Sequence, residues 1–227
     1  MPEPLEPAVG WGVLHLFCQA GPLADAEAVA SAVKAAEADG VQVVPAAMLG
    51  HKADLALMAL APDLWRLRQL QTDVTAAGLE VVDSYVSLTE LSEYAQGVPD
   101  ELKEARLHPR LPPEGKPAFC FYPMSKRRGD VSNWFTLPYD ERKDLMYAHG
   151  ASGRKFAGRV LQVISGSTGV DDFEWGVTLF AVHPDDLKEV VYTMRFDEAS
   201  ALYAEFGPFY TGMVAPLGEV LTAIGLE

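Results

Sequence analysis

The segments ADLALMALAP (53–62) and EWGVTLFAVHP (174–184) share one organisation, and this repetition indicates the fold. In each, an apolar run typical of a strand passes through a proline into a helical pattern with an aspartate near its start. The surrounding patterns predict the order β-α-β-β-α-β twice, which favours two tandem ferredoxin-like repeats. The first repeat has strands 13–18, 41–49, 53–60 and 81–88 with helices 25–39 and 62–70; the second has strands 118–124, 159–165, 173–182 and 206–213 with helices 138–148 and 184–194.

A stretch rich in proline, glutamate and glycine (97–116) separates the repeats. Each sheet has one apolar face, which is buried either by packing the two sheets together or by curling them into a common barrel. We therefore expect one compact α+β unit, with an N-terminal repeat at 1–100, a linker at 101–116 and a C-terminal repeat at 117–227.

The composition favours a soluble, acidic, globular protein. Of 227 residues, 49% are hydrophobic and 22% are charged, and the formal net charge is -14. This charge argues against nucleic acid as a partner, because phosphate binding needs a basic face. Signal-peptide features and apolar runs of about 18 residues are missing, so we expect a cytoplasmic protein without membrane insertion. Cys18 and Cys120 each lie in an apolar run, which predicts buried free thiols.

The segment FYPMSKRR (121–128) gathers more chemistry than any other part of the sequence. Tyr122 leaves an apolar strand just before Pro123, and this proline is expected to end the strand. The three cations at 126–128 are suited to holding carboxylates through charge-assisted hydrogen bonds. The alternatives are a tyrosine with its hydroxyl at the surface and a solvated run of charge.

His149 shares an apolar helical stripe with Leu145 and Met146, and Gly150 after it suggests a helix end. Its position fits a capping or core role, or a ligand role. Since no second His or Cys stands at ligand spacing, a zinc site is disfavoured, whereas a haem iron needs only one such histidine. The sequences GASG (150–153) and GSTG (166–169) lack the spacing of phosphate loops and are expected to be turns.

Six motifs together resemble the chlorite dismutase family, and within it the coproheme decarboxylases. They are YPMSKRR (122–128), NW (133–134), LMYAHG (145–150), ISGS (164–167), DDFEWGVTLF (171–180) and MRFDEASALYAEFGPFY (194–210). The resemblance implies a dimeric α+β barrel of two ferredoxin-like repeats, assembled as a homopentamer, with iron coproporphyrin III (coproheme) in the C-terminal half. It also implies that hydrogen peroxide oxidises the iron, and that two propionates lose carbon dioxide to become the vinyl groups of haem b.

The resemblance further implies roles for individual residues. His149 would be the axial ligand of the haem iron, and Tyr122 the residue oxidised to a radical that takes hydrogen from a propionate. Lys126 would be a propionate partner and proton source for the second decarboxylation, with Met124 packed beside it.

The remaining implied residues surround the porphyrin. Gln162 would lie over the iron on the distal side, and Arg195 and Ser200 would contact a propionate that is not consumed. A further propionate-binding arginine would be Arg106, with Arg110 as the alternative.

Two other functions remain open. One is chlorite dismutation, but the dismutases have a distal arginine where this chain has Gln162, and a neutral amide holds the chlorite anion less well. The other is a haem carrier or sensor without turnover, which would need His149 but not the radical-forming Tyr122.

Overall fold

The computed structural model describes residues 2–95 and 97–226. Within this part of the chain, nine strands form one sheet in the order β7-β6-β4-β1-β3-β2-β9-β5-β8, and a further pairing of β7 with β5 closes it. The elements are β1 (Gly12–Ala20), α1 (Ala26–Ala38), β2 (Gln42–Met48), β3 (Leu55–Ala61), α2 (Leu64–Ala76), β4 (Leu79–Thr89), α3 (Asp100–Leu107), β5 (Ala118–Lys126), the 3-10 helix η1 (Trp134–Thr136), α4 (Tyr139–Arg154), β6 (Val160–Gly166), β7 (Trp175–Ala181), α5 (Pro184–Met194), α6 (Glu198–Ala201), β8 (Ala204–Phe206), β9 (Tyr210–Val214) and α7 (Leu217–Ala223).

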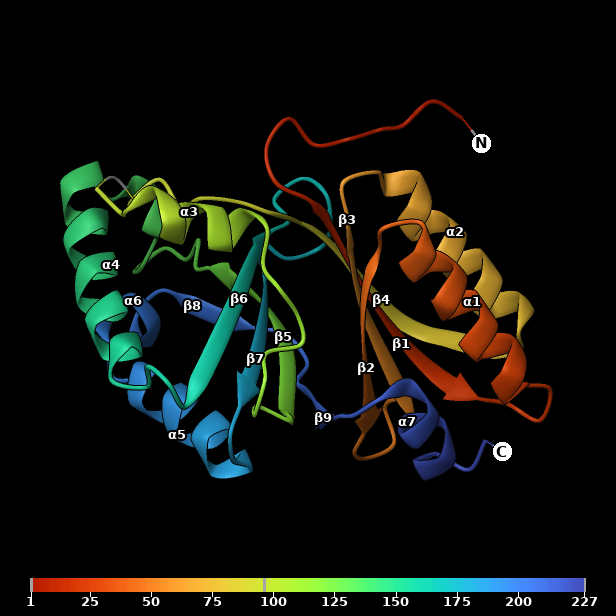
Figure 1. Cartoon of the computed structure of the whole chain (residues 1–227). Coiled ribbons are helices and arrows are strands. Elements are labelled where there is room, and N and C mark those ends of the chain that lie inside the picture. The colour runs from red at the N-terminus through yellow and green to blue at the C-terminus, as the bar shows by residue number, and fades with distance from the viewer. Residues whose placement is uncertain (1, 96, 227) are drawn as a thin grey trace.

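Each half of the closed sheet has the strand order of a ferredoxin-like unit. The first half runs β4-β1-β3-β2, and the second runs β5-β7-β6 with β8 and β9 pairing one after the other along the far edge of β5. Two seams join the halves, β2 with β9 and β4 with β6. The predicted α+β fold of two ferredoxin-like repeats is confirmed, and the two half-sheets form a common barrel (Figure 1).

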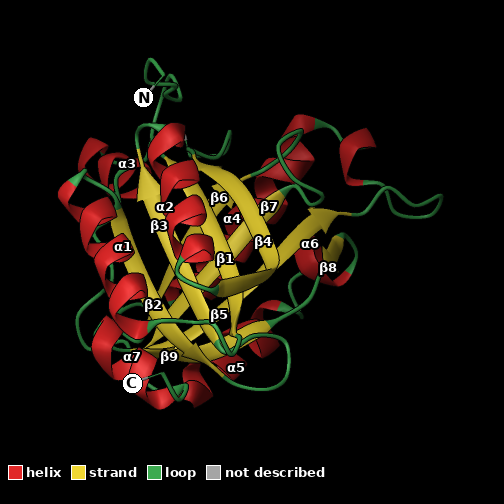
Figure 2. Cartoon of the chain, turned by 90° about the vertical axis from the view of Figure 1, so that its right-hand side faces the viewer, coloured by secondary structure: helices red, strands yellow, loops and turns green. Residues whose placement is uncertain are grey.

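Helices cover the closed sheet on two sides. α1 and α2 lie over the first half, and α4 and α5 lie on the side of the second half (Figure 1). Figure 2 shows α1 and α2 in front of the strands that they cover. α5 packs directly on β5 and β7, whereas the main packing partners of α4 are α5 and α6. The second half therefore has a helix, α4, that is held to the sheet mainly through other helices.

β3, the strand of the segment 53–62 that indicated the fold, is buried on both faces. Met58 and Leu60 belong to the apolar cluster inside the closed sheet, whereas Leu57 and Ala59 belong to the cluster under the outer helices. Alternate side chains of a strand point to opposite faces, so a strand with two covered faces reads as a continuous apolar run. Asp63 then caps α2 by accepting a hydrogen bond from the amide of Trp65 at 3.0 Å.

Several local expectations were wrong. β5 does not end at Pro123 but continues to Lys126, and the helix expected at 138–148 continues to Arg154, so that the expected turn at 150–153 is helical. The final strand, expected at 206–213, is split into β8 and β9. α3 lies within the proline-rich stretch 97–116, and the division of the chain at residues 100 and 116 stays a prediction.

Two further observations concern the cysteines and the helices. Cys18 and Cys120 are free and buried, as predicted. Among the described residues, no helix is both long enough and apolar enough to cross a membrane.

Candidate functional site

The outer face of β5 carries three of the residues expected in the site. Because β5 runs on to Lys126, Tyr122, Met124 and Lys126 alternate along one face of the strand. Tyr122 and Met124 belong to the cluster between the sheet and the helices of the second half, whereas Phe121 points into the barrel. The longer strand therefore places the whole set toward the helices.

Gln162 lies on the same face as this set. Cys120 of β5 pairs with Leu179 of β7, and Leu179 pairs with Gln162 of β6. Residues directly opposite each other in an antiparallel pair share a face, and Cys120 and Leu179 both belong to the outer cluster. The amide nitrogen Nε2 of Gln162 lies 3.8 Å from the sulfur of Met194 in α5.

Gln162 also faces α4. Its Nε2 is 3.7 Å from the position that a Cβ on Gly153 would occupy. Gly153 follows His149 by one helical turn, so the two residues share a stripe of α4. The neutral amide on the sheet thus lies across from the part of the helix that carries the histidine.

His149 is held from behind by polar groups. Its Nδ1 lies 3.2 Å from Oδ2 of Asp197 and 3.5 Å from the hydroxyl of Ser200. The other carboxylate oxygen of Asp197 accepts a hydrogen bond from Ser152 at 2.7 Å. Oδ2 itself is buried and lacks a hydrogen bond, and Nδ1 of His149 is the group that faces it. A histidine whose Nδ1 faces a carboxylate is in the arrangement that orients imidazoles toward metals.

The imidazole of His149 is favoured in its neutral form. Burial lowers its pKa below the usual value, the charge of Lys126 lowers it further, and Asp197 opposes both effects. A neutral imidazole keeps a lone pair on one nitrogen, and with Nδ1 turned to Asp197 that nitrogen is Nε2. The sequence suggested that the helix ends near His149, but α4 continues to Arg154.

Lys126 is buried next to the same helices. Its ammonium donates a hydrogen bond to the carbonyl of Ala199 at 2.7 Å and lies 4.3 Å from the ring centre of Trp134. Burial lowers the pKa of Lys126 to about 8, against the opposing charge of Glu174. An amine with this pKa exchanges its proton near neutral pH.

Two of the three cations at 126–128 are paired with carboxylates of this chain rather than left to hold those of a ligand. Arg128 pairs with Glu174 at 2.5 Å, and Arg127 lies 3.4 Å from Glu205. Glu174 also accepts the amide of Lys126 at 2.7 Å, so it fixes the end of β5. Only Lys126 of the three turns its charge toward the candidate site.

Tyr122 is enclosed by aromatic rings. The ring of Phe209 stacks on it with centroids 4.5 Å apart, and that of Phe206 meets it edge-on at 5.6 Å. Burial raises the pKa of the phenol well above its usual value, and Arg195, whose guanidinium lies 5.5 Å from the Phe206 ring, opposes this. The phenol therefore stays protonated at neutral pH and does not lie at the surface.

Three expected residues, Tyr122, Met124 and Gln162, thus lie on one face of the sheet, with Arg195 beside the ring of Phe206. His149 and Ser200 lie 3.5 Å apart at the adjoining helices, where Lys126 bonds to the carbonyl of Ala199. Arg106 and Arg110 are exposed, on α3 and just after it, and their role toward a propionate stays a prediction.

Sequence reasoning missed three residues of this region. Asp197 and Trp134 were overlooked because their contacts with His149 and Lys126 join segments far apart in the chain. Ser152 could have been found, since it follows His149 by three residues on one helix and so shares its face.

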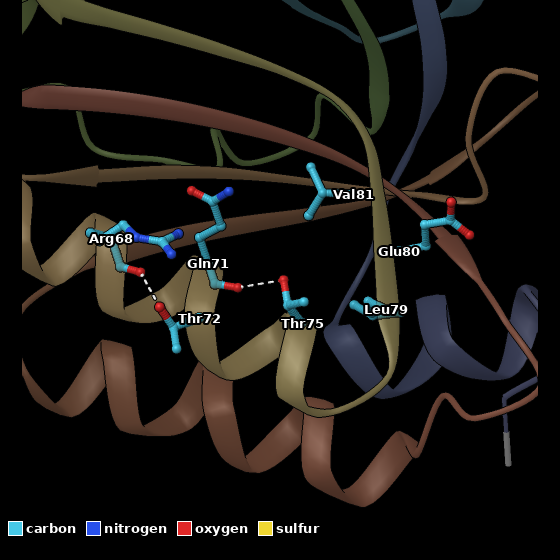
Figure 3. A pocket seen from close by; sticks show the side chains of 7 residues that line it. All are labelled: Arg68, Gln71, Thr72, Thr75, Leu79, Glu80 and Val81. Carbon is cyan, nitrogen blue, oxygen red and sulfur yellow. Dashed lines mark hydrogen bonds between the residues drawn. The ribbon is translucent and has the colours of Figure 1, made fainter.

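A surface hollow lies elsewhere, between α2 and β4 (Figure 3). Its lining residues are Arg68, Gln71, Thr72, Thr75, Leu79, Glu80 and Val81. The hydroxyls of Thr72 and Thr75 donate to carbonyls of their own helix, as the dashed lines in Figure 3 show. The hollow contains none of the site residues expected from the sequence.

Comparison with known proteins connects this geometry to a family. The family model for chlorite dismutase matches residues 23–215. A protein from Thermus thermophilus, described as a novel haem-binding protein, is 39% identical; the match covers 100% of this chain and 99% of that one, with a TM-score of 0.85. A variant of chlorite dismutase from Candidatus Nitrospira defluvii is 19% identical, with 96% of each chain covered and a TM-score of 0.75, which is a likeness of fold alone.

Proposed function

The chain belongs to the chlorite dismutase family, and from this premise we propose that it is a peroxide-dependent coproheme decarboxylase. It would convert iron coproporphyrin III to haem b by oxidative loss of two propionate carboxyl groups. The observation that carries the proposal is the shared face of β5, where the buried phenol of Tyr122 and the buried amine of Lys126 lie on the same side as the neutral Gln162.

Two features of the region fit a porphyrin between β6 and α4. Ile164 lies on the same face as Gln162, in the middle of β6, yet it is 50% exposed. An exposed branched side chain there leaves apolar sheet surface for a flat ligand to cover. The second feature is the buried Oδ2 of Asp197, which lacks a hydrogen bond that a metal-bound and reoriented His149 would supply.

In this proposal His149 holds the iron through Nε2, and Asp197 fixes the imidazole through Nδ1. When bound, the iron porphyrin supplies the redox chemistry with hydrogen peroxide. Gln162 offers an uncharged hydrogen-bonding group on the distal side, which suits peroxide better than the chlorite anion. The 39% identical relative described as haem-binding supports the porphyrin ligand.

The other residues act on the propionates. Tyr122 would pass an electron and its proton together to the peroxide-oxidised haem group, because its environment disfavours the phenolate, and the phenoxyl would then take a hydrogen atom from the reacting propionate, which restores the phenol. Lys126 binds a propionate and donates a proton, for which its pKa of about 8 is suited. Arg195 and Ser200 hold a propionate that remains, Met124 packs beside Lys126, and Arg106 or Arg110 provides a further cation. A homopentamer, as the resemblance implies, is also part of the proposal.

The test is a mass measurement on the porphyrin. The purified protein is mixed with iron coproporphyrin III, dosed with hydrogen peroxide and sampled over time. We expect stepwise loss of two carboxyl groups in the native protein and binding without mass loss in Tyr122→Phe. Tyr192→Phe is the matched control, because Tyr192 is exposed on α5, and it should behave like the native protein.

Two outcomes would reject the proposal. Tight porphyrin binding with no mass change in the native protein would indicate a haem carrier or sensor without turnover. Rapid release of dioxygen from added chlorite, without decarboxylation, would instead assign the dismutase activity.

A further inference from the structure

A group of oxidisable aromatic rings leads away from the candidate site. Trp134 meets Tyr203 edge-on with ring centroids 5.4 Å apart, and both rings are buried. Tyr94, from the segment after β4, packs against the cluster that Trp134, Tyr203 and Ala199 form. Tyr94 in turn stacks on Tyr139 at 5.7 Å, and Tyr139 is 37% exposed. Two aromatic pairs, one buried and one reaching the surface, thus lie in one packed cluster region.

The buried pair adjoins the site. The ammonium of Lys126 lies 4.3 Å from the Trp134 ring, and Lys126 belongs to the site through β5. Leu145 and Met146, one helical turn before His149, pack against the cluster that contains Trp134. Trp134 is therefore a close oxidisable neighbour of the residues proposed to hold the porphyrin.

Tyr94 has the surroundings that a redox-active phenol needs. The Nε of Arg142 donates a hydrogen bond to its oxygen at 2.9 Å, and Arg142 also lies 3.6 Å from the carboxylate of Glu93. Burial raises the pKa of Tyr94, and the neighbouring Glu93 raises it further, whereas Arg142 lowers it. When Tyr94 loses an electron its proton must leave, and the Glu93 carboxylate is the adjacent base that accepts it.

The surroundings of Tyr122 are different. Its stacked and edge-on partners are Phe209 and Phe206, and phenylalanine is much harder to oxidise than tyrosine or tryptophan. An electron hole on Tyr122 is thus confined by its neighbours, whereas one on Trp134 has a chain of phenols through which to leave. The two aromatic groups are suited to opposite tasks.

We propose that Trp134, Tyr203, Tyr94 and Tyr139 form a protective route that drains oxidising equivalents from the site when no propionate reacts. The inference rests on the proposed porphyrin site. Hydrogen peroxide is the oxidant: each molecule takes up two electrons and two protons to become two molecules of water, so the route operates twice, and uses two one-electron donors, for each peroxide. One electron moves inward at each step: Trp134 or Tyr203 is oxidised, then Tyr94, whose proton passes to Glu93, and then Tyr139, whose proton passes to solvent. A small one-electron donor in solution, such as a thiolate or ascorbate, restores Tyr139.

A photochemical experiment tests the route without relying on decarboxylation. Zinc coproporphyrin III is bound to the protein and illuminated with a cobalt(III) ammine complex, which takes one electron from the excited porphyrin and is reduced to cobalt(II). The porphyrin, one electron short, then oxidises the protein. A nitrone spin trap captures the resulting radicals, and peptide mass spectrometry locates them. We expect adducts on Tyr139 and Tyr94 and none above the dark control on Tyr192, which is more exposed but lies outside the route.

Two variants sharpen the result. Tyr94→Phe should abolish the Tyr139 adduct and leave adducts on Trp134 or Tyr203, while Tyr139→Phe should increase the adduct on Tyr94. Equal labelling of Tyr139 and Tyr192, or a Tyr139 adduct that persists in Tyr94→Phe, would overturn the route. Zinc porphyrin that fails to bind, or that binds His149→Ala as well as the native protein, would instead reject the proposed site, and the route with it.

Discussion

At the scale of single residues, the carboxylate of Asp197 is the group that most directly controls His149. We predict that Asp197→Asn weakens iron coproporphyrin binding at least about tenfold, the effect expected when the partner of a metal-ligating histidine is lost. The amide keeps the size of the side chain but removes the charge beside Nδ1, 3.2 Å away. The affinity is measured by spectroscopic titration.

Asp144→Asn is the matched control for this substitution. Asp144 lies on the exposed side of α4, so the variant has the same change in net charge without the contact to His149. Unchanged affinity in both variants would show that Asp197 does not act on the histidine, and an equal loss in both would show that only overall charge matters.

The individual residues that the sequence predicted are those with a local signal. Tyr122 and Lys126 lie in one short motif, and His149 shares a helical stripe with apolar residues. The ion pairs of Arg127 and Arg128 were not predictable from the motif, because their partners Glu205 and Glu174 come from distant segments. The same holds for Asp197.

At the scale of elements, the last turns of α4 contain two glycines that the sequence pattern takes for a turn. The helix persists there because its side chains have partners: Ser152 is buried and bonded to Asp197. Likewise β5 continues through Pro123 because no strand pairs with this proline on the edge where β8 and β9 lie. β8 and β9 pair with residues on either side of Pro123, and the carbonyl of Pro123 accepts the amide of Gly207. Tertiary contacts of this kind are invisible in local patterns.

The same glycines supply a prediction for the element. A Cβ added at Gly153 would come no closer than 3.6 Å to its neighbours, which is an ordinary contact. Gly153→Ala should therefore raise the free energy of unfolding by about 0.5–1 kcal/mol, because alanine loses less backbone entropy in a helix. Urea unfolding of the two proteins measures the difference. Gly158→Ala, at a positive φ of 83° outside the helix, should instead destabilise the protein, and a loss of stability in Gly153→Ala would show that α4 is tighter against β6 than the contacts indicate.

At the scale of the whole molecule, the order of strands within each repeat was predictable because every strand and helix has its own periodicity. Whether the two half-sheets close into one barrel was not predictable from these periodicities, and only the family resemblance implied the barrel. The two seams, β2 with β9 and β4 with β6, join segments from opposite repeats, and the sequence contains no local signal for such pairs. Inside the closed barrel, the seams are accompanied by polar contacts, including the hydrogen bond between Ser87 and Ser165 at 2.7 Å.

His15 makes the interior of this barrel sensitive to acid. Its Nε2 lies 2.9 Å from the hydroxyl of Thr178 across the barrel, its Nδ1 has no hydrogen-bond partner, and its ring lies 4.2 Å from that of Phe121. Burial lowers the pKa of His15 from 6.5 to about 3. Between these two values the unfolded chain binds a proton at His15 that the folded protein does not, so the contribution of His15 to stability is complete above pH 6.5 and is lost progressively as the pH falls toward 3.

We predict that this one group contributes on the order of 4 kcal/mol to the loss of unfolding free energy across that pH range. His15→Gln cannot be protonated but keeps a donor for Thr178, so its unfolding free energy should fall less steeply with pH than that of the native protein. His51→Gln, at an exposed turn, should retain the native slope. Urea unfolding at pH 7, 5.5 and 4 compares the three proteins. Parallel profiles for the native protein and His15→Gln would mean that the interior admits the charged imidazole, and the acid sensitivity of the barrel would then lie elsewhere.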